Sequence, residues 1–291
     1  MQKRFLIFDM STIIKLINKG ASVKIITGLM FCILMGGVHL RASGQKVYQV
    51  PNSQRYFIGI KAGVLASLTT YGDSDLEREF SPSLSGGFHA AGLINFPLKK
   101  NFSFQSEFGF ARMGRKVSFN SGSWSNTSTH NFLDFGMLLR RSFLLKVWKN
   151  IPSNWYFNLG PNIKYWLSGK GNVVSPGLPQ PYSIVFNGQS KGEYDKMYYY
   201  DANRWLFGMD VGVGMNAGTI KGQQVMVELR FLYGHTYLGG KDSVTPQSIN
   251  LLGFNDSLLA NFKTLSISVA YTIDFHTGEN KMGKTNKPNY H

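Results

Sequence analysis

Apolar and polar residues alternate along eight segments of the chain. The segments are residues 56–64, 84–96, 102–110, 132–140, 155–168, 205–216, 224–233 and 265–275. A period of two residues predicts β-strands, because successive side chains of a strand point to opposite faces. In residues 102–110 phenylalanines occupy one face, and the other face carries Ser103, Gln105, Glu107 and Gly109. The pattern therefore predicts an all-β protein.

The lengths of the segments and of the connections between them favour strands that cross a membrane. Most segments exceed the roughly five or six residues of globular strands and approach the roughly nine to eleven of a tilted membrane strand. Short connections at 97–101, 146–154 and 218–223 alternate with long ones at 69–80, 118–131, 169–203 and 234–261. This rhythm predicts a transmembrane antiparallel up-and-down β-barrel of about eight strands, with short periplasmic turns and long outer loops.

A soluble β-sandwich or lipocalin-like barrel is the alternative fold, and it would point the same apolar face inward. Periodicity alone does not say which face is inside. Strand length, the short and long connections, and the glycines on the polar face favour a membrane barrel with a narrow polar lumen. Aromatic residues near strand ends fit the girdles found at membrane interfaces. They are Tyr56, Trp155, Trp166, Trp205, Tyr233 and Phe275.

Residues 1–44 have the layout of a cleaved signal peptide. An apolar run at 25–40 follows Lys15, Lys19 and Lys24 and precedes small residues at 42–44. A transmembrane anchor is the alternative, but the run is shorter than the roughly 20 apolar residues that a spanning helix needs. Translation starts at Met1 or Met10. We then expect a periplasmic lead at 45–55, the outer-membrane barrel at 56–275 and a polar tail at 276–291.

Composition narrows the set of partners. The formal net charge is +15; residues 1–44 hold six bases and one acid, so the mature chain would carry +10. The single cysteine, Cys32, lies in the same segment, so no thiol chemistry is expected after export. The lysines scatter among turns and tail and form no helical stripe for nucleic acid. Outer-membrane lipid and lipopolysaccharide are the expected partners, together with other envelope proteins.

Motifs across residues 56–275 resemble the PorT-type family of outer-membrane β-barrels from Bacteroidetes. They are YFIGIKAG at 56–63, EFGFARMG at 107–114, FLDF at 132–135, LGP at 159–161 with KY at 164–165, GMDVGVG at 208–214 and VELR at 227–230. The chain departs from the family pattern at Gly136, where a proline is usual, and in the residues after Phe275. The resemblance implies an integral outer-membrane barrel, and the named relatives include a component of a protein-secretion and gliding apparatus. It does not imply a catalytic activity.

Eight charged residues fall on the predicted lumen face. They are Lys61, Glu107, Asp134, Arg140, Lys164, Asp210, Glu228 and Arg230. An eight-stranded barrel has an interior just wide enough for side chains to fill. Four acids and four bases are therefore expected to pair into a plug, and a gated solute path is the alternative.

Candidate catalytic and cofactor motifs are weak. His89 faces inward and could be combined with Ser85 and Asp210 in a lipid hydrolase, but their spacing does not bring them together. Residues 212–217 imitate a dinucleotide fingerprint, yet a strand follows where a helix is needed. We expect no enzyme activity, no cofactor and no metal site.

The loops and the outer surface carry the remaining candidates. The first long connection is acidic at Asp73, Asp75, Glu77 and Glu79. The third contains Tyr182, Tyr194, Tyr198, Tyr199 and Tyr200, which form either a recognition surface or a loop packed over the barrel mouth.

Two bases on the outward face of the third strand, Arg112 and Lys116, are placed to meet lipopolysaccharide phosphates or simply to snorkel. Arg141 is expected near the periplasmic interface. The pattern as a whole predicts a structural, assembly or binding component of the cell envelope, with a narrow porin as the alternative and a lipid enzyme as a distant third.

Overall fold

The computed structural model describes residues 56–98, 101–119, 124–148, 151–174, 179–187, 195–220, 223–234, 236–240 and 257–275. The expected signal peptide at 1–44, the lead at 45–55 and the tail at 276–291 lie outside the described residues, as does Tyr194. The described part of the chain contains no helix that is long and apolar enough to cross a membrane.

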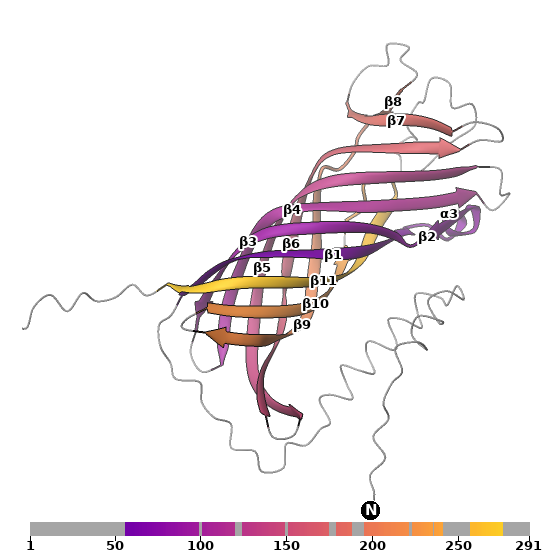
Figure 1. The fold of residues 1–291 in the computed structure, drawn as a ribbon. Coiled ribbons are helices and arrows are strands. Elements are labelled where there is room, and N and C mark those ends of the chain that lie inside the picture. The colour runs from indigo at the N-terminus through magenta and orange to yellow at the C-terminus, as the bar shows by residue number, and fades with distance from the viewer. Residues whose placement is uncertain are drawn as a thin grey trace, which may run out of the picture. The chain divides into compact units, whose positions relative to one another are not determined.

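Eight antiparallel strands form a closed ring (Figure 1). In order around the ring they are β1 (Tyr56–Tyr71), β3 (Ser85–Pro97), β4 (Phe102–Phe119), β5 (Ser125–Trp148), β6 (Ile151–Val174), β9 (Trp205–Ile220), β10 (Gln223–Gly234) and β11 (Ala260–Phe275). The last strand pairs with the first, from Tyr56 opposite Phe275 to Tyr71 opposite Ala260. The predicted all-β, eight-stranded barrel is confirmed.

Three short strands and one helix lie at the end of the ring opposite the short turns. Strand β2 (Phe80–Ser83) pairs with β4, β7 (Pro179–Phe186) pairs with β6, and β8 (Lys196–Tyr199) runs parallel to β7. Helix α3 (Ser74–Glu79) is capped by Asp73, whose side chain accepts a hydrogen bond from the Asp75 amide. We name this end the loop end and the other the turn end (Figure 1).

The connections at the loop end are shorter than predicted, because several strands continue beyond their clear alternation. Strands β4 and β5 reach residues 119 and 125, so the connection predicted at 118–131 shrinks to 120–124. Strand β6 continues to Val174, and β7 and β8 occupy much of the predicted connection at 169–203. The connections that were predicted to be long are thus partly built of sheet.

The outward faces of the ring strands form a continuous apolar belt. Its exposed members are Ile58, Ile60, Val64, Phe88, Ile94, Phe96, Phe102, Phe108, Leu133, Leu139, Leu145, Leu159, Leu167, Trp205, Phe207, Met209, Val213, Val225, Leu229, Tyr233, Leu265, Ile267, Val269, Tyr271 and Ile273. At the same level the buried side chains are mostly polar, for example Lys61, Asn158 and Thr272. Apolar side chains face out and polar ones face in, which is the arrangement for a lipid environment.

Beyond the belt, on the loop-end part of β4, β5 and β6, this polarity reverses. Outward positions there are polar, while Met113, Phe132, Trp166 and Val173 are buried. They belong to an apolar cluster, the loop-end cluster, which also includes Tyr71, Phe80, Ile184, Met197, Tyr199, Leu206, Leu232, Leu238, Leu258 and Phe262. Water replaces lipid as the outer solvent, so the hydrophobic effect now favours an apolar interior.

This reversal corrects two positions on β6. Trp166 was predicted in an interfacial girdle, but it is fully buried in the loop-end cluster. Ser168 was predicted to face the lumen, but it is exposed. The pairing of β5 with β6 shifts between Asn131 and Phe132, so that Leu167 is an extra residue on β6. Such a bulge turns the following residues to the other face.

A charge within the belt is expected to destabilise the barrel far more than one beyond it. Val269 is 53% exposed at mid-belt, opposite Ala62, and we expect Val269→Arg to cost roughly 2–4 kcal/mol in a lipid bilayer. Thr127→Arg, on the polar outer face of β5, should stay within about 0.5 kcal/mol of wild type.

Denaturant unfolding from phospholipid vesicles, followed by tryptophan fluorescence, measures both losses. The change in gel migration between unboiled and boiled samples verifies that each variant has folded. Equal losses for the two variants would contradict the assignment of the belt.

Candidate functional site: the charge network inside the barrel

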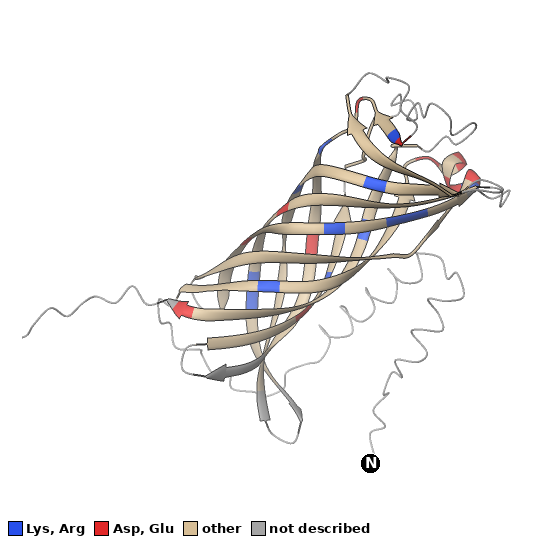
Figure 2. Ribbon diagram, turned by 45° about the horizontal axis from the view of Figure 1, so that its top comes forward, with Lys and Arg blue, Asp and Glu red and all other residues tan. Residues whose placement is uncertain are grey.

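All eight residues of the predicted lumen network lie on the inward face. Seven are buried, at 3–8% exposure, and the side chain of Asp134 is 24% exposed. They come from β1, β4, β5, β6, β9 and β10. Figure 2 shows that charged residues are sparse along the barrel strands, while α3 holds several acidic ones. Their inward positions were predicted correctly because apolar and polar residues alternate strictly along the strands within the belt.

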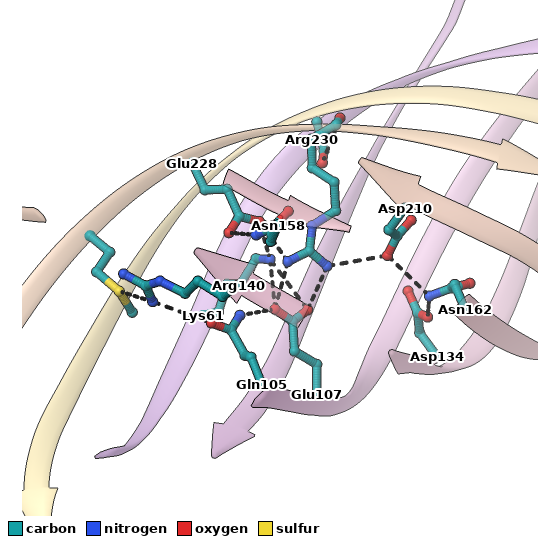
Figure 3. Close-up of polar contacts among 12 residues, drawn as sticks. Lys61, Gln105, Glu107, Asp134, Arg140, Asn158, Asn162, Asp210, Glu228 and Arg230 are labelled. Atoms are coloured by element: carbon teal, nitrogen blue, oxygen red, sulfur yellow. Dashed lines mark hydrogen bonds and ion pairs between the residues drawn. The ribbon is translucent and has the colours of Figure 1, made fainter. Parts of the chain in front are cut away.

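Arg230 on β10 is the centre of the network (Figure 3). Its two terminal nitrogens donate to the two carboxylate oxygens of Glu107 at 2.7 and 2.6 Å, which is the paired geometry that makes arginine–carboxylate contacts strong. The same guanidinium donates from Nε to Glu228 at 2.8 Å and from Nη1 to Asp210 at 3.3 Å. One base thus contacts three acids and joins β10 to β4 and β9 across the interior.

Lys61 on β1 provides the second bridge. Its ammonium lies 3.2 Å from Glu107 Oε1 and 2.8 Å from Glu228 Oε1. Glu228 also accepts hydrogen bonds from Tyr156 Oη at 3.1 Å and Asn158 Nδ2 at 2.8 Å. The buried carboxylates are therefore compensated by two bases and by neutral donors, as buried charges require.

A second ion pair joins the network through an amide. Lys164 on β6 contacts Asp134 on β5 directly. Asn162 Nδ2 lies 2.5 Å from Asp134 Oδ1 and 3.4 Å from Asp210 Oδ2. Asn162 was not singled out in the sequence, although it shares the inward face with Lys164.

Arg140 departs from the expected pairing of four acids with four bases. Within the described residues it forms no ion pair, and its donors reach Gln105 Oε1 at 3.3 Å, Asn216 Oδ1 at 3.2 Å and Met226 Sδ at 3.1 Å. Its Cζ atom lies 3.5 Å from the ring centroid of Tyr156, a cation–π contact. Gln105 links it to the network by donating to Glu107 at 2.5 Å. This base lies nearer the turn end, where neutral groups surround it.

The loop-end interior holds polar residues that the sequence analysis missed. Arg115 is 1% exposed and donates to Tyr71 Oη at 3.1 Å. His130 is fully buried 2.9 Å from Ser128 Oγ, with its ring against Trp166. Continued alternation could have predicted the inward position of Arg115, which lies on the same face of β4 as Glu107. The clear alternation of apolar and polar residues ends at Phe110, so the prediction stopped there.

The proposed catalytic and cofactor arrangements gain no support from the geometry. Among the residues that the structure describes, Nε2 of His89 has no hydrogen-bond partner, so it contacts neither Ser85 nor Asp210 through that atom. Residues 212–217 lie within strand β9, and no helix follows them directly.

The tyrosines proposed for recognition are mostly packed inside. Tyr182, Tyr198 and Tyr199 are at most 4% exposed, and Tyr182 and Tyr199 belong to the loop-end cluster. Tyr182 also donates to Asn126 Oδ1 at 2.9 Å. Tyr200 is half-buried. These rings stabilise the loop end, and the alternative of a packed loop accounts for them better than an open contact surface does.

Small spaces remain between the described side chains of the interior. A cavity of about 40 Å³ lies beside His89, Glu107, Asp134 and Arg230, with Leu232 from the loop-end cluster on its wall. That volume holds a few water molecules. The charge network and the loop-end cluster thus fill the barrel at two successive levels.

A closed ring with an apolar outer belt and a buried polar interior defines an integral β-barrel of the bacterial outer membrane. The chain belongs to the family described as outer membrane protein beta-barrel domain, whose model matches residues 47–236. This protein is therefore located in the outer membrane. No curated protein matches the chain in sequence.

Three solved structures to which the chain is similar are distant from it in sequence. The outer membrane protein OprG from Pseudomonas aeruginosa is 9% identical over 77% of this chain and 97% of its own, with a TM-score of 0.47. Neisserial surface protein A (NspA) is 10% identical over 77% and 98%, with a TM-score of 0.35. The attachment invasion locus protein Ail of Yersinia pestis is 11% identical over 75% and 98%, with a TM-score of 0.33.

The two arginines of the charge network are expected to respond differently to replacement. Arg230→Met removes the base shared by three carboxylates, and leaving buried charges uncompensated costs roughly 3–5 kcal/mol. Arg140→Met leaves no carboxylate without its base and removes a costly buried charge, so its loss should be less than half as large.

Both free energies of unfolding come from denaturant titration in the same phospholipid vesicles. Tyr156→Phe, which removes one hydrogen bond to the carboxylate of Glu228, provides a reference of roughly 1.5–3 kcal/mol. A larger loss for Arg140→Met than for Arg230→Met would contradict the assignment of Arg230 as the centre.

Proposed function

We propose that this chain is a non-conducting and non-enzymatic barrel that serves the cell envelope as a structural, assembly or binding component. Its loop end faces the cell exterior and its short turns face the periplasm. The observation that carries this proposal is the bridging of Glu107, Glu228 and Asp210 by Arg230 and Lys61 across the barrel interior. A permeant solute would have to break these contacts.

Two barriers in series support a closed lumen. The charge network occupies the level of the belt, and the loop-end cluster lies beyond it with Trp166, Phe132 and Tyr199 at no more than 1% exposure. An ion that passed the first barrier would meet an apolar one, which does not hydrate it. The function is then carried by the outer surface and the loop end.

The resemblance to PorT-type barrels of Bacteroidetes supports a narrower role within this proposal. The ordered motifs include Glu107, Glu228 and Arg230, which are network residues. We infer that the chain anchors or assembles a surface complex, such as a protein-secretion or gliding apparatus, through contacts with other envelope proteins.

A narrow porin is the second candidate. The small cavity beside Glu107 and Arg230 and the polar interior favour it, because rearranged side chains could join such spaces into a path.

Conductance distinguishes the two candidates. The purified full chain in planar lipid bilayers should show no discrete current steps, under conditions in which an open porin does. Arg230→Met should remain closed at the loop end, because the loop-end cluster does not depend on that base. Stable current steps of uniform size from the wild type would support the porin and contradict the closed barrel.

Stoichiometric co-purification tests the assembly role. We expect chemical cross-linking in the native membrane, followed by purification of the full chain, to recover one or more envelope proteins in a fixed ratio. Val269→Arg lowers barrel abundance and should lower recovery in proportion, whereas Thr127→Arg should leave it unchanged unless β5 contacts the partner. Recovery of the barrel alone, at normal abundance, would contradict an assembly role.

A further inference from the structure

The barrel wall is taller on one side than on the other. Strands β4, β5 and β6 continue past the belt to residues 119, 125 and 174, whereas β9 begins at Trp205 and β10 ends at Gly234, both at the level of the belt. The taller strands present an outward surface beyond the belt, which we name the polar wall face. It consists of Arg112, Lys116 and Ser118 on β4, Ser125, Thr127, Thr129 and Asn131 on β5, and Ser168, Lys170, Asn172 and Val174 on β6.

The polar wall face carries three bases and no acid. Pairing registers place Arg112 opposite Asn131, Lys116 opposite Thr127, and Thr129 opposite Lys170. Lys170 is thus two strands from β4, roughly 10 Å away. The bases surround a central strand whose outward side chains are hydroxyls and an amide. Such groups donate hydrogen bonds to phosphate oxygens.

Hydrogen bonds hold part of this surface in place. Arg112 Nη2 donates to Thr129 Oγ1 at 3.3 Å, and Asn131 Nδ2 donates to Ser168 Oγ at 3.0 Å. Lys116 and Lys170 are exposed. Within the described residues none of the three bases forms an ion pair, whereas Arg78 on the nearby α3 is paired with Asp75 at 3.5 Å. The cationic surface is therefore available to an external anion.

The height of this surface relative to the belt identifies the anion. Arg112 comes two residues after Phe110, and Asn131 and Ser168 lie beside Leu133 and Leu167, which are among the outermost apolar residues on their strands. The polar wall face therefore begins where the hydrocarbon of the membrane ends. The anionic groups at that level are lipid phosphates, and in the outer leaflet these belong to lipopolysaccharide.

We propose that the polar wall face binds the phosphorylated headgroup of lipopolysaccharide through Arg112, Lys116 and Lys170, with the hydroxyls of Thr127 and Thr129 as further donors. The inference rests on the proposed orientation, with the loop end outside, and is independent of whether the lumen conducts. It extends the two bases predicted from the sequence to a surface of three strands on one side of the barrel.

Binding of lipid A to the purified full chain in detergent tests this proposal. We expect the triple variant Arg112→Gln/Lys116→Gln/Lys170→Gln to bind lipid A about tenfold more weakly than wild type. A matched control, Arg78→Gln/Arg141→Gln/Lys263→Gln, removes three bases from elsewhere on the described surface and should change binding by less than about twofold. Native mass spectrometry counts the bound lipids, and the gel-migration change verifies folding.

Two further ligands separate the sources of phosphate. Lipid A without its phosphates should bind wild type and the triple variant equally, because the bases then lack their target. Phosphatidylglycerol should bind wild type more weakly than lipid A does. Equal binding of lipid A by wild type and the triple variant, or preference of the wild type for phosphatidylglycerol, would overturn the proposal. If the triple variant fails to fold, Lys116→Gln/Lys170→Gln gives the same comparison at two exposed positions.

Discussion

Lipid offers no hydrogen bond to a peptide group, so every backbone amide and carbonyl within the belt has to be bonded inside the protein. The pairing of β1 with β11 meets this constraint, since it leaves the ring without an open edge. Closure then determines where each side chain goes. Alternate residues face hydrocarbon and the rest share a narrow interior with side chains from the opposite wall.

The confined interior explains why its charges form a network instead of separate pairs. Arg230 has five donors in a planar arrangement. Three carboxylates lie within its reach: Glu107 on β4 across the interior, Asp210 on the adjacent strand β9 and Glu228 on its own strand β10. Removing one charge from such a set leaves the others buried and uncompensated. The side chains that form the first of the two proposed barriers are therefore also needed for the stability of the barrel.

Alternation predicted the belt and the inward position of Lys61, Glu107 and Arg230, because a single solvent, lipid, acts on the whole outer face there. It failed where that solvent changes. Beyond Phe110 and Leu133 the apolar residues move to the inside, so Trp166 was assigned to an interfacial girdle although it is buried. The pattern left open whether Tyr182 and Tyr199 form a recognition surface or a packed loop, and both are buried. Alternation also could not predict which inward side chains contact one another. It places Arg140 inside, but only the three-dimensional packing shows that Arg140 contacts Tyr156 and amide side chains.

Because the wall is taller on one side, the two sides of the barrel present different outer surfaces. Strands β4, β5 and β6 carry the polar outward surface, while β9 and β10 end at the level of the belt. A molecule that diffuses in the plane of the membrane therefore meets a different surface according to the direction from which it approaches. Neighbouring proteins in a crowded membrane would bind one side of the barrel in preference to the other. A complex built on this barrel would therefore have a defined rotational orientation about the barrel axis.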